Sequence, residues 1–166
     1  KLIPEYKNLD SWGFEDDKEI IKYFNKTKWL EEYILNILIE LKEEGTIDDV
    51  LSNVTKIHTD EHSEFEVDAI TYRKYKLYAI SITSIDKEEY AKSKLYEIRQ
   101  RSRDLAGDEA GICYINLCWN IDSLGKEYKN IWDNFLPKNT LILGASDFSD
   151  LKIKLKEWMM GGEKIA

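Results

Sequence analysis

The chain has 166 residues, of which 43% are hydrophobic and 12% aromatic. This size and composition suit one domain with a real core, leave little room for two domains, and exclude wholesale disorder. The 32 acidic residues outnumber the 24 basic ones, and the net charge of -8 excludes a generally basic protein that coats nucleic acid. A local basic patch remains compatible with this charge.

Further classes are excluded by what the sequence does not contain. No run approaches the roughly 18 consecutive apolar residues of a membrane span, and no secretory signal segment is visible. The two cysteines, Cys113 and Cys118, lie close together in an apolar stretch, where free buried thiols are expected. A zinc site would need further ligands besides the cysteines, and the histidines of the sequence are His58 and His62. We therefore expect a cytoplasmic protein with no membrane segment.

The hydrophobic pattern predicts a lead-in followed by one α/β domain. Residues 1–26 are mixed and acidic and form the predicted lead-in, and residues 27–166 form the predicted domain. Apolar residues at helical spacing predict a helix over residues 28–43 that is buried on most sides. Alternation of apolar and polar residues predicts a strand over residues 48–58.

A hairpin and a second helix follow. Alternation over residues 65–70 and the apolar segment Lys76–Thr83, joined by the short turn Arg73–Tyr75, predict two antiparallel strands. Apolar and small residues at helical spacing then predict a helix over residues 87–105. Gly107 lies just beyond this helix and is its predicted stop.

The last third of the chain adds two strands and two helices. The apolar run at residues 111–117 predicts a buried strand, and residues 140–144 predict another. Helices are predicted over residues 123–135 and about 149–160. The complete order begins with α-β-β-β-α-β, so we predict the α/β class with a mixed sheet flanked by helices.

Carboxylates of the hairpin and of the first helix are the candidate functional groups. Asp68 lies in FEVDAI within a predicted strand, where Asp is disfavoured, and Glu66 lies two residues earlier on the same predicted face. Glu31 lies in WLEEY at the start of the first helix. Converging carboxylates can hold a divalent cation such as Mg²⁺. The alternative is that Asp68 is solvated at a hairpin end and that Glu31 interacts with the helix dipole.

The helix after the hairpin carries an uneven number of basic residues. Lys94 and Glu97 are three positions apart on one face, as an ordinary ion pair or as part of a site. Lys92, Arg99 and Arg103 lie on the other flank and suit contacts with phosphate or a solvated helix face.

These motifs and their order resemble a known superfamily. The α-β-β-β-α-β order with WLEEY, FEVDA, YKLYAISITS and KSKLYEIRQRSRDLAGDEA is similar to PD-(D/E)XK restriction-endonuclease-like proteins, over about residues 28–157. The chain resembles in particular the nuclease domain of CRISPR ancillary proteins, which usually follows a CARF domain that senses cyclic oligoadenylate. The resemblance implies cleavage of DNA or RNA with Mg²⁺ or Mn²⁺ in antiviral defence. No sensing domain is evident in these 166 residues, so the resemblance implies that they are the effector half.

The resemblance also implies roles for individual residues. Asp68 becomes the central metal ligand, with help from Glu66, Glu97 or Glu31. Asp68, Glu31, Glu97 and Lys94 form the implied catalytic group, in which Lys94 orients the attacking water or stabilises the developing charge.

One part of the superfamily pattern is missing. Ser81 and Thr83 occupy the positions of the acidic-x-Lys pair, and neither can replace a carboxylate or an ammonium group. We expect Lys94 and Glu97 to supply the relocated groups, with the small Ser81 and Thr83 leaving space for them and contacting nucleic acid.

The leading hypothesis is therefore a metal-dependent endonuclease, which by analogy of fold would act as a homodimer. The alternative is a catalytically degenerate nuclease-fold module for nucleic-acid binding or oligomerisation.

Overall fold

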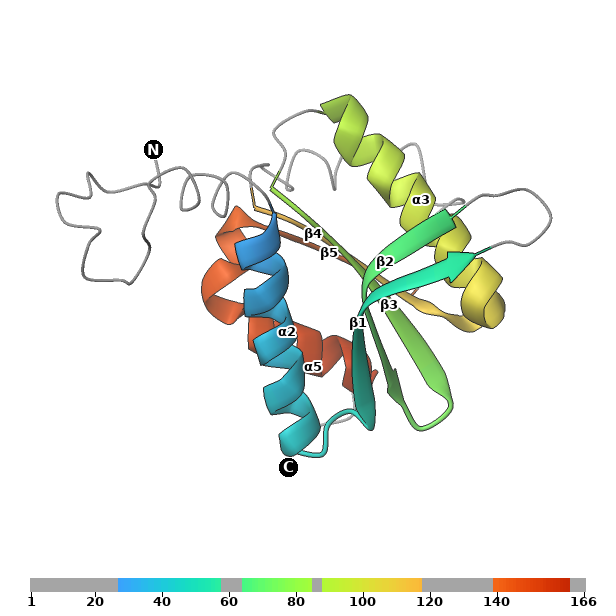
Figure 1. Cartoon of the computed structure of the whole chain (residues 1–166). Coiled ribbons are helices and arrows are strands. Elements are labelled where there is room, and N and C mark those ends of the chain that lie inside the picture. Colours follow the sequence, from blue (N-terminus) through green and yellow to red (C-terminus); the bar gives the residue numbers. More distant parts are fainter. Residues whose placement is uncertain (1–26, 58–63, 85–87, 118–138, 162–166) are drawn as a thin grey trace, which may run out of the picture.

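The computed structural model describes residues 27–57, 64–84, 88–117 and 139–161 (Figure 1). Several predictions fall outside these ranges and stay predictions: the lead-in over residues 1–26, the loop with His58 and His62, Cys118, and the helix over residues 123–135.

In the described ranges, five strands form one mixed sheet in the order β1-β2-β3-β4-β5. The strands are β1 (Asp49–Ile57), β2 (Glu64–Arg73), β3 (Lys76–Thr83), β4 (Gly111–Asn116) and β5 (Thr140–Gly144). Strand β2 is antiparallel to both β1 and β3, whereas β4 is parallel to β3 and β5 is parallel to β4.

Helices cover both faces of this sheet. Helices α2 (Lys28–Glu43) and α5 (Leu151–Met160) lie on one face, and α3 (Glu88–Ala106) lies on the other (Figure 1). A short 3-10 helix, η2 (Gly107–Glu109), follows α3, and another, η3 (Ala145–Asp150), precedes α5. The predicted α/β class, the α-β-β-β-α-β order and the flanked mixed sheet are confirmed. No helix among these described ranges is long and apolar enough to cross a bilayer.

Two apolar clusters hold the layers together. Leu30, Ile34 and Leu38 of α2 are fully buried against the sheet, in one cluster with α5 residues such as Leu155. Cys113 of β4 belongs to the same cluster as a free thiol, and burial raises its pKa.

The second cluster packs α3 onto the opposite face, with residues such as Leu95 and Ile98. Gly107, whose φ is 73°, ends α3 as predicted, because glycine adopts this left-handed conformation without strain. The helical period therefore places the apolar stripe of each helix against the sheet.

The β1–β2 ribbon changes face in its middle. Val67 packs in the α3 cluster, whereas Ala69, two residues later, packs in the α2 cluster. Regular alternation would put both on one face. Across the ribbon Ser52 pairs with Ala69 and Val54 with Val67, and Asn53 between them has φ 50°. Asn tolerates this conformation better than most residues, so the local twist is concentrated at Asn53, opposite Asp68.

Gly111 at the start of β4 lies where no side chain fits. A Cβ atom there would lie 3.0 Å from Cε1 of Tyr78, nearer still to its Cδ1, and 3.1 Å from Cζ2 of Trp158. Neither ring is free to retreat, because the Tyr78 hydroxyl donates to the Met159 carbonyl at 2.9 Å and Trp158 Nε1 donates to the Asn139 carbonyl at 3.2 Å. We expect Gly111→Ala to lower the free energy of unfolding by about 1–3 kcal/mol in urea titrations. An unchanged midpoint would mean that the rings adapt.

Candidate functional site

The site is built where two neighbouring strands separate. Strands β2 and β3 pair from Arg73 opposite Lys76 to Ala69 opposite Ile80, and their pairing ends there. Strand β2 continues alongside β1 as far as Glu64, so the β1–β2 ribbon leaves the rest of the sheet. We call this point the fork. Asp68 is the first residue of β2 on the ribbon side of the fork.

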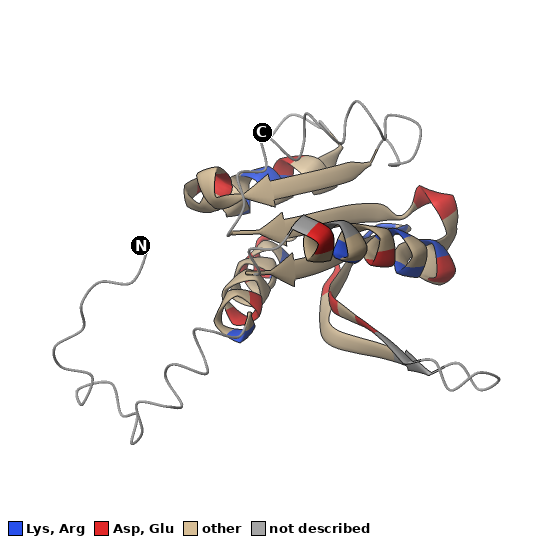
Figure 2. Ribbon diagram, turned by 90° about the horizontal axis from the view of Figure 1, so that it is seen from above, with Lys and Arg blue, Asp and Glu red and all other residues tan. Residues whose placement is uncertain are grey.

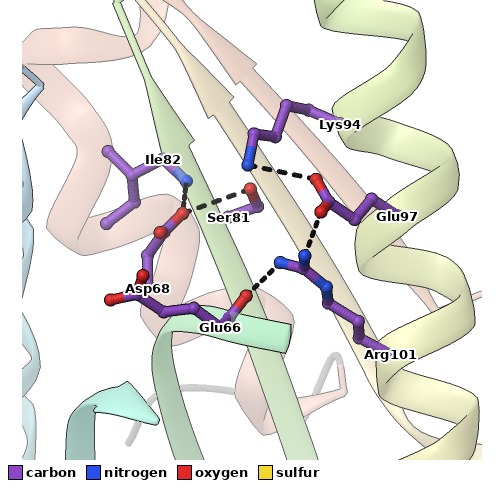
Figure 3. A network of polar contacts seen from close by, with 7 residues as sticks. All are labelled: Glu66, Asp68, Ser81, Ile82, Lys94, Glu97 and Arg101. Carbon is purple, nitrogen blue, oxygen red and sulfur yellow. Dashed lines mark hydrogen bonds and ion pairs between the residues drawn. The ribbon is translucent and has the colours of Figure 1, made fainter. Parts of the chain in front are cut away.

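The Asp68 carboxylate takes the place of a strand partner. Its Oδ2 accepts hydrogen bonds from the backbone N–H of Ile82 at 2.6 Å and from Ser81 Oγ at 3.2 Å (Figure 3). Within the described part of the chain, Oδ1 receives no hydrogen bond. The carboxylate is thus fixed through one oxygen, and the other oxygen is available to a ligand.

Three of the predicted carboxylates influence one another across two layers of the fold. Burial raises the pKa of Asp68, and the nearby charge of Glu66 adds to this, against the hydrogen bonds from Ile82 and Ser81. Burial likewise raises the pKa of Glu31 on α2, with further contributions from the charges of Asp68 and Glu66. Burial and neighbouring negative charge thus disfavour the ionised forms of Asp68 and Glu31, as expected of a site for a cation.

Helix α3 brings an ammonium group to the same place. Lys94 extends from α3 over Ser81 toward Asp68 (Figure 3). Desolvation alone would lower the pKa of Lys94, but the hydrogen bond with Glu97 and the charges of Glu97 and Asp68 raise it. Lys94 is therefore a cation at neutral pH, and the structure does bring it into electrostatic contact with Asp68.

Glu97 stands behind Lys94 rather than beside Asp68. Its Oε2 lies 3.0 Å from Lys94 Nζ, and its Oε1 forms an ion pair with Arg101. Both oxygens already face cations, which disfavours a third cation at Glu97. The arrangement suits Glu97 for holding Lys94, and its role as a metal ligand stays a prediction.

The residues predicted to contact nucleic acid divide into two groups. Ser81 and Thr83 are buried, so they present no surface to a phosphate. That their small size leaves space for the relocated groups stays a prediction. Arg99 and Arg103 lie on a different side of α3 from Lys94, and Arg103 forms an exposed ion pair with Asp108 at 3.2 Å. The side chain of Lys92 lies outside the described part.

Charge along α3 is mixed rather than uniformly basic. Basic and acidic residues alternate along the helix (Figure 2). Two of its cations, Lys94 and Arg101, are engaged with Glu97 at the fork. The positive run seen in the sequence is therefore only partly available for phosphate contact.

Sequence reasoning missed two parts of the site. Arg101, which also donates to the backbone carbonyl of Glu66, follows Glu97 by four positions and Lys94 by seven. This spacing places all three on one helical face and could have identified Arg101. The backbone N–H of Ile82 carries no such signal, because it became available only through the separation of β2 from β3.

The donor set at the fork suits a weakly chelated divalent cation. In the ranges that the structure describes, no three His, Cys, Asp or Glu side chains are grouped closely enough to hold a metal ion by themselves. Mg²⁺ is commonly bound through only one or two carboxylates, and water and substrate phosphates complete its octahedron. Asp68, with its available Oδ1 and its neighbours Glu66 and Glu31, fits that mode.

Comparisons with known proteins add information on the fold. No family model matches the chain, and no curated protein was found to match it. The chain is similar to protein VC1899 from Vibrio cholerae, with a TM-score of 0.67 and 19% identity over 90% of this chain and 37% of that one. It is also similar to Can2 from Sulfobacillus thermosulfidooxidans, solved in complex with cyclic tetra-adenylate, with a TM-score of 0.62 and 16% identity over 83% and 37% of the two chains.

A third similarity is weaker. The small subunit R.BspD6I2 of the heterodimeric restriction endonuclease R.BspD6I gives a TM-score of 0.49 and 13% identity over 90% of this chain and 82% of that one, too low to establish a common fold. The first two similarities show a shared fold. The chain spans little more than a third of the length of each of those two proteins.

Proposed function

We propose that this chain is a metal-dependent nuclease that hydrolyses phosphodiester bonds in DNA or RNA, as the effector domain of a CRISPR-associated or related prokaryotic defence protein. One observation carries the proposal: Asp68 stands at the fork with an available oxygen, and Lys94 extends toward it from α3 near enough for their charges to interact. The family resemblance of the sequence and the fold shared with Can2 support the same conclusion.

Each group at the fork has a role in this reaction. Asp68, with Glu66 and Glu31, would hold Mg²⁺ or Mn²⁺, and such an ion polarises the scissile phosphate and lowers the pKa of a water molecule. The protonated Lys94 stabilises negative charge that develops on the phosphate, because a fixed cation in a partly buried site acts more strongly than one in water. Glu97 holds Lys94 in place.

Activation and assembly are also part of the proposal. Can2 was solved with cyclic tetra-adenylate bound, and this chain corresponds to 37% of it. The family resemblance associates such nucleases with a CARF-type sensor. We therefore propose that a cyclic oligoadenylate signal reaches this domain through a sensor domain, and that the nuclease works as a homodimer.

A second candidate is a degenerate module that binds nucleic acid or mediates oligomerisation without cleavage. Two observations favour it: Ser81 and Thr83 stand in place of the acidic-x-Lys pair, and the described residues contain no ready three-ligand metal group.

Cleavage assays separate the two candidates. We expect the wild-type protein to cut plasmid, single-stranded DNA or RNA with Mg²⁺ or Mn²⁺ and not with a chelator. Asp68→Ala should be at least about 100-fold slower, since the loss of metal-assisted catalysis costs several kcal/mol. Equal cleavage by both proteins would contradict the assignment. Titration calorimetry with Mn²⁺ gives an independent result, because a degenerate module should bind no metal.

A further inference from the structure

Arg101 connects the two elements that carry the opposite charges of the site. One guanidinium nitrogen donates to the backbone carbonyl of Glu66 on β2, and the other donates to Oε1 of Glu97 on α3 (Figure 3). The Arg101 side chain is only 17% exposed, its contact with Glu97 is partly buried, and its contact with the Glu66 carbonyl lies at the surface.

The contact with Glu66 constrains β2 where strand pairing with β3 no longer does. Beyond Ala69, β2 has no pairing with β3 to fix its position relative to the sheet. The hydrogen bond from Arg101 ties this segment to α3 at Glu66, two residues from Asp68. The position of the Asp68 carboxylate relative to α3 therefore depends on this link as well as on Ile82 and on Val67, which packs in the α3 cluster.

The contact with Glu97 fixes the other half of the site. A lysine ammonium is a point charge on a flexible stem, whereas a guanidinium has a rigid, planar set of donors. Arg101 holds Oε1 of Glu97, which leaves Oε2 directed at Lys94 Nζ, 3.0 Å away. A chain of two ion pairs that begins at Arg101 thus holds Lys94 above Ser81, together with the Tyr90 ring, whose centroid lies 5.8 Å from Lys94 Nζ.

We propose that Arg101 is a positioning residue that sets the separation between Asp68 on β2 and Lys94 on α3. Its catalytic consequence rests on the proposed nuclease function. Arg101 itself touches no reacting group: it acts through the Glu66 backbone and the Glu97 carboxylate.

Kinetics of Arg101 variants test this role. We expect Arg101→Gln to lower kcat on a labelled oligonucleotide with Mn²⁺ by about 10- to 100-fold, as misplacement by about 1 Å does, with KM changed less than about twofold. Arg101→Lys should fall between Arg101→Gln and the wild type, since one ammonium cannot serve both acceptors well. Lys152→Gln is the matched control, because Lys152 also bridges two carboxylates, Glu40 and Glu44, on the opposite layer. An unchanged kcat, or a rise in KM alone, would overturn the proposal.

A second measurement does not depend on activity. The order parameter of the Lys94 ammonium, from ¹⁵N relaxation, should fall in Arg101→Gln and in Glu97→Gln and stay at the wild-type value in Lys152→Gln. Unchanged order of Lys94 in Arg101→Gln would overturn the positioning role. If the wild-type protein cleaves no substrate, the nuclease assignment fails, and the Lys94 measurement still decides the role of Arg101.

Discussion

Asp68→Asn should raise the thermal midpoint of the metal-free protein and at the same time reduce cleavage about a thousandfold. Burial, and to a smaller extent the charge of Glu66, raises the pKa of the Asp68 carboxyl group and penalises its ionised form. An asparagine at this position keeps an oxygen for the N–H of Ile82 and removes the charge. A gain of about 1 kcal/mol would appear as a midpoint about 2–4 °C higher in calorimetry. The loss of cleavage follows from the loss of several kcal/mol of metal-assisted stabilisation.

The difference in thermal midpoint between Asp68→Asn and the wild type should shrink as the pH falls. A carboxyl group whose pKa is higher in the folded than in the unfolded state destabilises the fold at pH values above that pKa. The penalty is released as the pH falls through the raised pKa of Asp68. The midpoints of the wild type and of Asp68→Asn should therefore converge in acid.

Metal binding should make the wild type more stable than Asp68→Asn, the reverse of the order expected without metal. Mn²⁺ added at neutral pH should raise the midpoint of the wild type by mass action and leave that of Asp68→Asn unchanged. Glu157→Gln, which removes an exposed carboxylate from α5, is the matched control and should follow the wild type throughout. A lower midpoint for Asp68→Asn in the absence of metal would instead show that Asp68 serves the fold.

Lys94→Gln should lower kcat by about 100- to 1000-fold, the loss typical of one fixed donor that stabilises developing charge. Because its pKa lies above the ordinary 10.5, Lys94 keeps its proton across neutral and mildly alkaline pH. It therefore acts as a cation and not as a general base. The ratio of wild-type to variant rates should be constant between about pH 7 and pH 9.

Two variants sharpen this result. Lys94→Arg should recover part of the lost rate, because it restores the charge in a different geometry. Lys42→Gln removes a lysine that pairs with Asp49 at an exposed position of another layer and should leave the rate unchanged. A deficit of Lys94→Gln that disappears as the pH rises would instead indicate that Lys94 must lose its proton.

Much of the fold could be predicted because it depends on local patterns. The bounds of α2, β3 and β5 agree with the sequence prediction, since each follows from apolar periodicity and adjacent turn residues. The change of face at Val67 and Ala69 could not be predicted, because strand alternation assumes a regular backbone. That irregularity depends on Asn53 across the ribbon and on pairing between segments far apart in the chain.

The candidate site was predictable in its residue types and less so in its connections. Asp68 stood out because a strand disfavours an Asp, whereas Lys94 was singled out by the family resemblance, since its spacing from Glu97 also fits an ordinary ion pair. The hydrogen bond from the backbone N–H of Ile82 to the Asp68 side chain, which takes the place of a strand partner, forms only because β2 and β3 have separated. The burial of Ser81 and Thr83 likewise follows from tertiary packing, and their spacing in the strand cannot indicate it.

The fork divides the site between the β1–β2 ribbon and helix α3. The β1–β2 ribbon projects from the sheet and carries the carboxylates of β2, whereas Lys94 belongs to a helix packed against the strands that stay together (Figures 1 and 2). A small rotation of the ribbon would change the gap between the negative and the positive charges, and Val67, which packs in the α3 cluster, opposes such a rotation. A force on the ribbon, from a bound nucleic acid or a neighbouring domain, would thereby act on the distance between the groups that carry the chemistry.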